Sequence, residues 1–346
     1  MSTALTEVVG MGIGRGFRLA LVAALTLVAT AALAPGAQAA NCFGRKPTIE
    51  GTEGNDVIRG TIHVDVIETL RGNDVIKGRG APDLICSGPG NDTVNGGLGM
   101  DRIDGNLGND RINGGAQEDF ILGDNGADKL NGKGSSDTIE GGEGPDVIRG
   151  GIAGDNIDGG LGDDQVLGDS GEDVVDGGPG ADTVDGGDDN DTLIQYPDGN
   201  PDTYLGGPGI DALSLGQYSP GPDTVSIDGV ANDGGNCPQQ CEGDNVALSV
   251  ENLFAGGNNV YRLTGSDGPN VISGGPGEDV IDGAGGGDIV HGGSGDDIIS
   301  GNIGDDALYG GPDNDTLDGG ANTDECHGEQ GTMDTAANCE SVNGIP

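Results

Sequence analysis

One acidic residue type stands out by its spacing. Asp recurs every nine residues over sixteen consecutive positions. These are Asp56, Asp65, Asp74, Asp83, Asp92, Asp101, Asp110, Asp119, Asp128, Asp137, Asp146, Asp155, Asp164, Asp173, Asp182 and Asp191. Carboxylates bind hard divalent cations, and Ca²⁺ takes about six to eight oxygen ligands. Carboxylates at a fixed interval therefore indicate a row of cation sites rather than one catalytic centre.

A glycine-rich turn stands before each Asp and is complete in seven places. One example is Gly96-Gly97-Leu98-Gly99-Met100-Asp101, and the others lie at 141–146, 159–164, 177–182, 206–211, 274–279 and 292–297. Gly can adopt positive φ and turn its carbonyl inward, because it has no Cβ. These turns would therefore supply carbonyl oxygens beside each carboxylate.

Short strands must hold these turns. An aliphatic residue follows each of the sixteen Asp residues after two positions, from Ile58 to Leu193, while the residues on either side are often polar. This alternation predicts three-residue strands whose middle side chain points inward. We expect an all-β chain of turn, strand, turn and strand, stacked around a thin aliphatic core.

The repeats at residues 51–211 and 265–326 resemble the calcium-binding nonapeptide repeats of the repeats-in-toxin (RTX, haemolysin-type) family, with the pattern G-G-x-G-x-D-x-U-x. The resemblance implies a parallel β-roll, a β-solenoid in which two nonapeptides form one 18-residue coil. It also implies Ca²⁺ ions between successive coils.

Stacking at this period divides the sixteen loops between two edges. On one edge, which we call the glycine edge, Gly stands two residues before each Asp: Gly54 and Asp56, Gly72 and Asp74, Gly90 and Asp92, Gly108 and Asp110, Gly126 and Asp128, Gly144 and Asp146, Gly162 and Asp164, Gly180 and Asp182. On the other, which we call the mixed edge, this position holds His63, Ala81, Gly99, Gln117, Ser135, Ala153, Gly171 and Asp189. We expect an intact calcium ladder on the glycine edge and patchy or absent calcium on the mixed edge. The alternative is that the fold tolerates these substitutions without losing metal.

The register slips after Asp191, resumes at Asp211 and fails from about Gly216 to Thr264. Val225-Ser226-Ile227 and the segment 246–250 alternate like strands, so irregular coils should continue the stack there. In the second block both edges keep the preceding Gly, and the predicted calcium ligands are Asp279, Asp288, Asp297 and Asp306. The predicted division is a signal peptide (1–39), an N-terminal cap (40–50), a first repeat block (51–215), an irregular insert (216–264), a second block (265–325) and a C-terminal cap (326–346).

The N-terminal segment has the pattern of a secretory signal peptide. Arg15 and Arg18 precede an apolar run at 19–33, and Ala37 and Ala39 suit cleavage before Ala40. A retained membrane anchor and a start at Met11 are the alternatives. No second apolar segment follows, so we expect a secreted, extracellular protein with no membrane span in the mature chain.

The composition narrows the possible partners. The chain has 346 residues, 59 Asp plus Glu against 14 Lys plus Arg, and a formal net charge of -45. Nucleic acids and anionic membrane surfaces require a basic patch, so neither is expected, and cations are the natural partners. Carboxylates one strand spacing apart repel by roughly 3 to 4 kcal/mol per pair at an effective dielectric near 20. Without Ca²⁺ the chain should therefore be disordered.

Six cysteines allow fifteen pairings, and an oxidising compartment favours disulfides over metal binding. Our choice is Cys42 with Cys86, Cys237 with Cys241, and Cys326 with Cys339. Zinc at Cys237 and Cys241 is the alternative, but zinc needs four ligands and no His lies nearby.

The chain has no H-E-x-x-H, G-x-S-x-G or Walker lysine motif, and its three His residues are scattered. The first hypothesis is a non-enzymatic, exported calcium-binding repeat protein that is a structural, adhesive or matrix component with an unidentified cell-surface or matrix partner. The second is a secreted hydrolase with a small catalytic site in the 216–264 insert and the repeats as its folding module. The third is a secretion module that has lost its cargo. The N-terminal signal disfavours it, because family members commonly leave through a C-terminal one.

Overall fold

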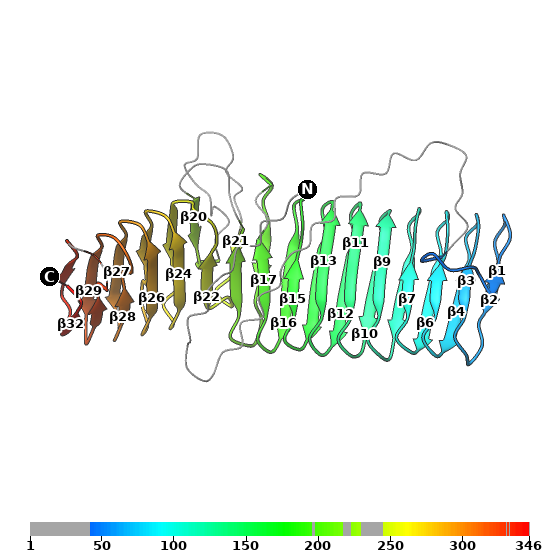
Figure 1. Cartoon of the computed structure of the whole chain (residues 1–346), viewed down its shortest axis with the longest axis horizontal. Coiled ribbons are helices and arrows are strands. Elements are labelled where there is room, and N and C mark those ends of the chain that lie inside the picture. The colour runs from blue at the N-terminus through cyan, green and yellow to red at the C-terminus, as the bar shows by residue number, and fades with distance from the viewer. Residues whose placement is uncertain are drawn as a thin grey trace, which may run out of the picture. The chain divides into compact units, whose positions relative to one another are not determined.

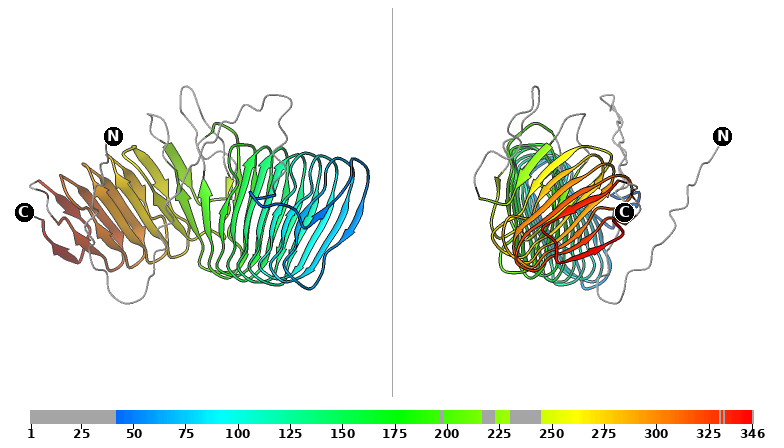
Figure 2. Two further views of the ribbon diagram at one scale, coloured as in Figure 1. Left: turned by 45° about the vertical axis from the view of Figure 1, so that its right-hand side comes forward. Right: turned by 90° about the vertical axis from the view of Figure 1, so that its left-hand side faces the viewer.

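A computed structural model of the chain describes residues 42–195, 198–216, 223–229, 245–329, 331 and 333–345. These residues form a parallel β-solenoid of about fifteen coils, and none of them is helical. Figure 1 shows the strands side by side in chain order, and Figure 2 shows the coils stacked one behind another. The prediction of an all-β parallel solenoid is confirmed.

Successive strands of the first block alternate between two sheets. The sixteen-stranded sheet, which we call the continuous sheet, contains β1 (Ile49–Glu50), β3 (Val66–Glu68), β5 (Leu84–Cys86), β7 (Arg102–Asp104), β9 (Phe120–Asn125), β11 (Thr138–Glu143), β13 (Asn156–Leu161), β15 (Val174–Asp176), β17 (Thr192–Gln195), β19 (Ala212–Leu215), β22 (Asn252–Ala255), β24 (Val271–Pro276), β26 (Ile289–Ser294), β28 (Ala307–Tyr309), β30 (Glu325–His327) and β32 (Ser341–Asn343).

The opposite face is divided into two sheets. The ten-stranded sheet contains β2 (Val57–Arg59), β4 (Val75–Gly80), β6 (Thr93–Leu98), β8 (Arg111–Gly115), β10 (Lys129–Lys133), β12 (Val147–Ile152), β14 (Gln165–Ser170), β16 (Thr183–Asp188), β18 (Thr203–Leu205) and β21 (Asn245–Val246). The six-stranded sheet contains β20 (Asp223–Ser226), β23 (Tyr261–Thr264), β25 (Val280–Asp282), β27 (Ile298–Ile303), β29 (Thr316–Ala321) and β31 (Thr335–Ala337). Loops of the glycine edge lead into the ten-stranded sheet, and loops of the mixed edge lead into the continuous sheet.

The core is the predicted column of aliphatic side chains. Ile76 pairs with Val94 in β6, and Val94 pairs with Ile112 in β8, so equivalent residues of successive coils lie directly over one another. From Ile67 to Leu193 every inward aliphatic of the first block is at most 2% exposed. Ile58 is only partly buried, because the first coil has no coil before it.

The irregular insert interrupts one face only. In the continuous sheet β19 pairs with β22 and β22 with β24, whereas the ten-stranded sheet ends at β21 and the six-stranded sheet begins at β20. The strand predicted at 246–250 ends at Val246. A turn follows because the Val250 N–H donates to the Ala247 carbonyl oxygen.

Two of the three predicted disulfides are confirmed. Cys42 is bonded to Cys86 and Cys326 to Cys339, with Cα separations of 5.6 and 6.1 Å. The pair predicted at 237 and 241 lies outside the described residues. Next to the first disulfide, the Arg102 guanidinium lies between the rings of Phe43 and Phe120, 4.5 and 5.1 Å from their centroids. This contact attaches the N-terminal cap to the outer face of the continuous sheet.

Candidate metal centre

From Asp74 onward, one carboxylate oxygen of each repeat Asp in the first block accepts a hydrogen bond from the preceding coil. On the glycine edge the Asp110 N–H donates to Asp128 Oδ1 at 2.7 Å, and on the mixed edge the Asp119 N–H donates to Asp137 Oδ1 at 2.7 Å. The second block repeats the contact, for example from the Asp279 N–H to Asp297 Oδ1 at 2.8 Å. The Asp ladder therefore joins the coils on both edges through Oδ1.

The other carboxylate oxygen, Oδ2, is buried and accepts no hydrogen bond. This is so for Asp74, Asp92, Asp110, Asp128, Asp146, Asp164 and Asp182 of the glycine edge, for Asp83, Asp101, Asp119, Asp137, Asp155, Asp173 and Asp191 of the mixed edge, and for Asp279, Asp288, Asp297, Asp306 and Asp315 of the second block. A buried charged atom without a partner is costly. Two regular rows of such oxygens fit the ligands of a hard cation.

Backbone carbonyls converge on the same positions. A Cβ on Gly105 would lie 2.7 Å from Asp110 Oδ2 and 2.8 Å from the carbonyl oxygen of Gly123 in the next coil. On the mixed edge a Cβ on Gly78 would lie 2.7 Å from Asp83 Oδ2 and 2.5 Å from Gly96 O. Glycine is required where these acceptor oxygens approach the backbone. Nowhere in the described ranges do three His, Cys, Asp or Glu side chains form a metal-sized cluster.

The two edges of the first block differ two residues before the Asp. On the glycine edge Gly90, Gly108 and Gly126 have φ of 158°, 134° and 156°, a conformation open to glycine alone. On the mixed edge Ala81, Ser135 and Ala153 have φ of 75°, 82° and 75°, the ordinary left-handed region. Gly99 and Gly171 of the mixed edge have φ of 131° and 135°, as on the glycine edge, so the loop backbone follows the residue type at each position.

Hydrogen bonds at this position follow the same division. From Gly72 to Gly162, each of the six glycine-edge glycines donates its N–H to a carbonyl oxygen of the next coil. The bonds of Gly108 to Asn125 O at 2.8 Å and Gly126 to Glu143 O at 2.7 Å are examples. On the mixed edge the Gly99 N–H is bound instead by the side-chain Oε1 of Gln117 at 2.5 Å. On the mixed edge Gly171 and Asp189 also donate to carbonyl oxygens of the next coil, both at 3.0 Å, so among the described residues the series of these bonds is continuous only on the glycine edge.

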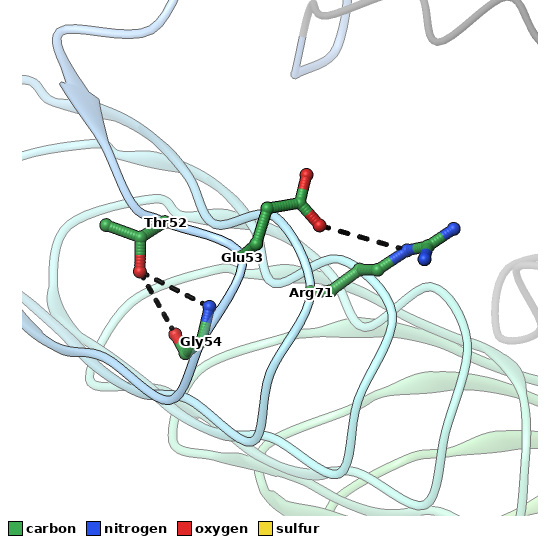
Figure 3. Close-up of polar contacts among 4 residues, drawn as sticks. All are labelled: Thr52, Glu53, Gly54 and Arg71. Atoms are coloured by element: carbon green, nitrogen blue, oxygen red, sulfur yellow. Dashed lines mark hydrogen bonds and ion pairs between the residues drawn. The ribbon is translucent and has the colours of Figure 1, made fainter.

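In the first loops of each repeat block, a Thr or Ser residue donates to the side-chain oxygen that has no donor in the later loops. Asp56 Oδ2 accepts bonds from the Thr52 N–H at 2.6 Å and from Thr52 Oγ1 at 3.0 Å. Figure 3 shows the Thr52 hydroxyl turned toward the N–H and carbonyl of Gly54, beside the exposed ion pair of Glu53 and Arg71.

Two further loops follow this scheme. The Thr61 N–H donates to Asp65 Oδ2 at 2.6 Å, and the Ser266 N–H donates to Asn270 Oδ1 at 2.8 Å. In these loops a protein donor occupies the oxygen that is unpartnered elsewhere. The signal in the sequence is Thr or Ser directly after the first Gly of the turn, which we did not interpret.

Burial also opposes ionisation of the ladder. Burial raises the pKa of Asp110 to about 8, with the Asp92 N–H opposing the shift and the Asp92 carboxylate adding to it. Burial likewise raises the pKa of Asp101 to about 7 and that of Asp182 to about 8. A cation beside Oδ2 would compete with a proton for the same atom.

The predicted metal residues fall into separate rows. Asp56 to Asp182 and their glycines lie along the glycine edge. Asp279 and Asp297 lead into the six-stranded sheet, and Asp288 and Asp306 into the continuous sheet. The structure therefore does not bring all twenty residues to one place.

A second ladder beside the glycine edge was missed. The Asn73 N–H donates to Asn55 Oδ1 at 2.8 Å, and the Asn91 and Asn109 N–H groups continue the series at 2.9 and 3.0 Å. The signal is Asn immediately before the Asp at 18-residue intervals. This asparagine ladder stabilises the stacking of coils through exposed side-chain amides instead of carboxylates.

A family model described as RTX calcium-binding nonapeptide repeat (4 copies) matches residues 48–76, 59–94, 95–130, 131–166, 158–193, 264–299 and 300–332. No curated protein matches the chain significantly. Across the described ranges, no helix is long and apolar enough to cross a membrane.

Proposed function

The chain belongs to the RTX calcium-binding nonapeptide repeat family, and we propose that it is an exported repeat protein whose solenoid folds on binding Ca²⁺ outside the cell. Its role on this proposal is that of a structural, adhesive or matrix component, without catalytic activity. Bound Ca²⁺ would supply positive charge to the buried oxygens, and its binding free energy would become folding free energy.

The observation that carries this proposal is the pair of rows of buried, unpartnered Asp Oδ2 atoms. Their Oδ1 atoms are already engaged by the adjacent coil, so the free oxygen is held in place and oriented. The carbonyl oxygens that approach it across the coil boundary complete an all-oxygen donor set of the kind Ca²⁺ prefers.

The continuous ladder of the first block is assigned to the glycine edge. The residues that would hold Ca²⁺ there are Asp74, Asp92, Asp110, Asp128, Asp146, Asp164 and Asp182, with the carbonyls of the loops that contain Gly72, Gly90, Gly108, Gly126, Gly144, Gly162 and Gly180. We assign the loop of Gly54 and Asp56 to the cap, because Thr52 already donates to Asp56 Oδ2. In the second block Asp279, Asp288, Asp297 and Asp306 would serve on both edges.

Two observations support an extracellular location. The disulfides Cys42–Cys86 and Cys326–Cys339 suit an oxidising compartment. Extracellular Ca²⁺ also lies in the range of weak, multi-ligand sites, about 0.1 to 1 mM. The signal peptide proposed at 1–39 lies outside the described residues.

A calcium titration followed by circular dichroism tests the proposal. In chelator the chain without residues 1–39 should give the spectrum of a disordered chain, and β signal should appear cooperatively at about 0.1 to 1 mM Ca²⁺. Mg²⁺ should substitute poorly, because it demands octahedral geometry and retains its water. Equal β content in chelator and in Ca²⁺ would refute calcium-coupled folding.

A further inference from the structure

The few basic residues of the chain gather on one face of the solenoid. On strands β2 to β12 of the ten-stranded sheet, the outward side chains flanking each core aliphatic include no acidic residue. They include five exposed basic ones: Arg59, Lys77, Arg111, Lys129 and Arg149. The net charge of the whole chain conceals this separation of basic and acidic side chains between faces, which arises because consecutive strands alternate between sheets.

Like charges on this face lie side by side. Arg59 is in register with Lys77, and Arg111 with Lys129. In the described part of the chain these four side chains form no ion pair, whereas Arg149 contacts Asp169 at 2.8 Å. In-register like charges destabilise a sheet. Four unpaired cations in a strongly acidic protein therefore favour an anionic partner for this face.

The opposite face carries the complementary charge over the same block. On strands β7 to β15 of the continuous sheet, the outward side chains flanking the core aliphatics include four acidic residues, Asp104, Glu140, Asp158 and Asp176. The last three are in register with one another. Burial raises the pKa of Glu140, and the Asp158 carboxylate adds to the shift. The one outward basic residue there, Arg102, is held between Phe43 and Phe120.

We propose that the basic face of the ten-stranded sheet, Arg59 to Arg149, docks on the acidic face of the continuous sheet, Asp104 to Asp176, of a second copy of this chain. Both faces repeat at the same interstrand spacing of about 4.8 Å, so several charges can pair at once. Because the two faces are different surfaces, the contact is heterologous. It leaves one face of each kind free and continues into chains of molecules rather than closing as a dimer.

The size of the faces suits a weak, repeated contact. At about 4.8 Å between strands and about 3.3 Å per residue, the six strands of the basic face give roughly 500 Å² and the five strands of the acidic face roughly 400 Å². This total of roughly 900 Å² lies in the range of weak, transient interfaces. Exposed ion pairs contribute about 0.2 to 1 kcal/mol each and weaken with salt. Assembly should therefore require protein concentration and low ionic strength.

Sedimentation of the folded chain in excess Ca²⁺ tests this inference. At about 50 mM salt the average mass should rise with protein concentration, and association should weaken about tenfold or more at about 500 mM. The variant Lys77→Glu/Arg111→Glu/Lys129→Glu makes both faces acidic and should be monomeric. The variant Glu140→Lys/Asp158→Lys/Asp176→Lys makes both faces basic and should also be monomeric. An equimolar mixture of the two should associate again, which misfolded variants would not do.

A control reverses charges away from both faces. Arg71→Glu/Arg262→Glu alters two exposed basic residues outside the basic and acidic faces and should associate like the unmodified chain. A folded, calcium-loaded chain that stays monomeric at high concentration and low salt would overturn the inference. A monomer that binds dextran sulfate through Lys77, Arg111 and Lys129 would overturn it in favour of an anionic polysaccharide. The inference rests on the calcium-loaded fold, but circular dichroism reports that fold separately from mass.

Discussion

The backbone N–H of Asp110 donates a 2.7 Å hydrogen bond to Oδ1 of Asp128, and Oδ2 of Asp128 is buried without a donor. One side chain thus has two separable functions. One oxygen joins adjacent coils, and the other is free for a cation. Variants can address each function in turn.

Replacing Asp110 by Asn should remove a calcium ligand and keep the ladder. The amide oxygen can still accept the Asp92 N–H, which is 2.7 Å from Asp110 Oδ1, while the amide nitrogen replaces the unpartnered oxygen. We expect fewer bound Ca²⁺ ions and a higher calcium midpoint for folding, measured by calorimetric titration and circular dichroism. The matched variant Asp119→Asn, on the mixed edge, should leave the stoichiometry almost unchanged. Equal effects of the two would contradict the assignment of the ladder to the glycine edge.

Replacing Gly108 by Ala should destabilise the fold. Gly108 has φ of 134°, and its added Cβ would overlap the carbonyl oxygen of Gly90. Backbone strain of this kind costs about 1 to 3 kcal/mol, before any loss of metal. A Cβ on Gly134 would meet no atom within 4 Å, so Gly134→Ala should be close to neutral. Urea unfolding in saturating Ca²⁺ distinguishes them, and equal midpoints would count against a close approach at Gly108.

Replacing Thr52 by Gly should convert a cap into a complete repeat turn. With Thr52→Gly, the segment from Gly51 to Asp56 matches the full pattern G-G-x-G-x-D and lacks the hydroxyl bond to Asp56 Oδ2. We expect one additional Ca²⁺ per chain by equilibrium dialysis. In low Ca²⁺ the first coil should be less stable by about 1 kcal/mol, seen as faster amide exchange near Asp56. An unchanged stoichiometry would show that Thr52 does not limit metal binding at this loop.

The pH dependence should reverse when Ca²⁺ is removed. Burial raises the pKa of Asp101 and Asp137 to about 7 and of Asp110 and Asp182 to about 8, so the folded chain holds protons that the unfolded chain releases near pH 4. In chelator, folding should therefore be most favourable below about pH 4 and should decline as the pH rises from about 4 to about 8, where the unfolded carboxylates are ionised and the folded ones still hold protons. In Ca²⁺ the calcium concentration at the folding midpoint should instead rise as the pH falls through that range, because protons compete with Ca²⁺ for Oδ2. Circular dichroism at several pH values measures both trends, and parallel trends would contradict this competition.

Much of the fold follows from the sequence because each coil repeats one local rule. The nine-residue interval places an Asp, a glycine turn and an inward aliphatic in every half coil. The predicted strands therefore stay in register from Asp56 to Asp191. Tyr261 shows where this reasoning ends. Its N–H donates to Asp279 Oδ1 as a repeat Asp would, although its side chain is a buried aromatic ring. The backbone position was preserved while the residue type changed, and a search for Asp cannot detect that.

The candidate site could be predicted only in outline. The spacing of Asp and Gly identifies the rows, but two different φ ranges at Gly108 and Ala153 become visible only when the coils are built. The donors of Thr52 and Thr61 were missed for a similar reason. Whether a hydroxyl and N–H reach a carboxylate four residues later depends on the turn conformation rather than on composition.

The insert that divides one face and leaves the other continuous sets the mechanical character of the molecule. In a solenoid each coil is stabilised by its immediate neighbours. Between β19 and β24 hydrogen bonds cross in the continuous sheet, while β21 and β20 belong to separate sheets. Cooperativity is therefore transmitted across the insert by one continuous sheet and, on the other face, only by the isolated bridge of Ile227 and Val246. Under tension, or after a cut in one block, unfolding should stop at this boundary, and the other block should keep its coils.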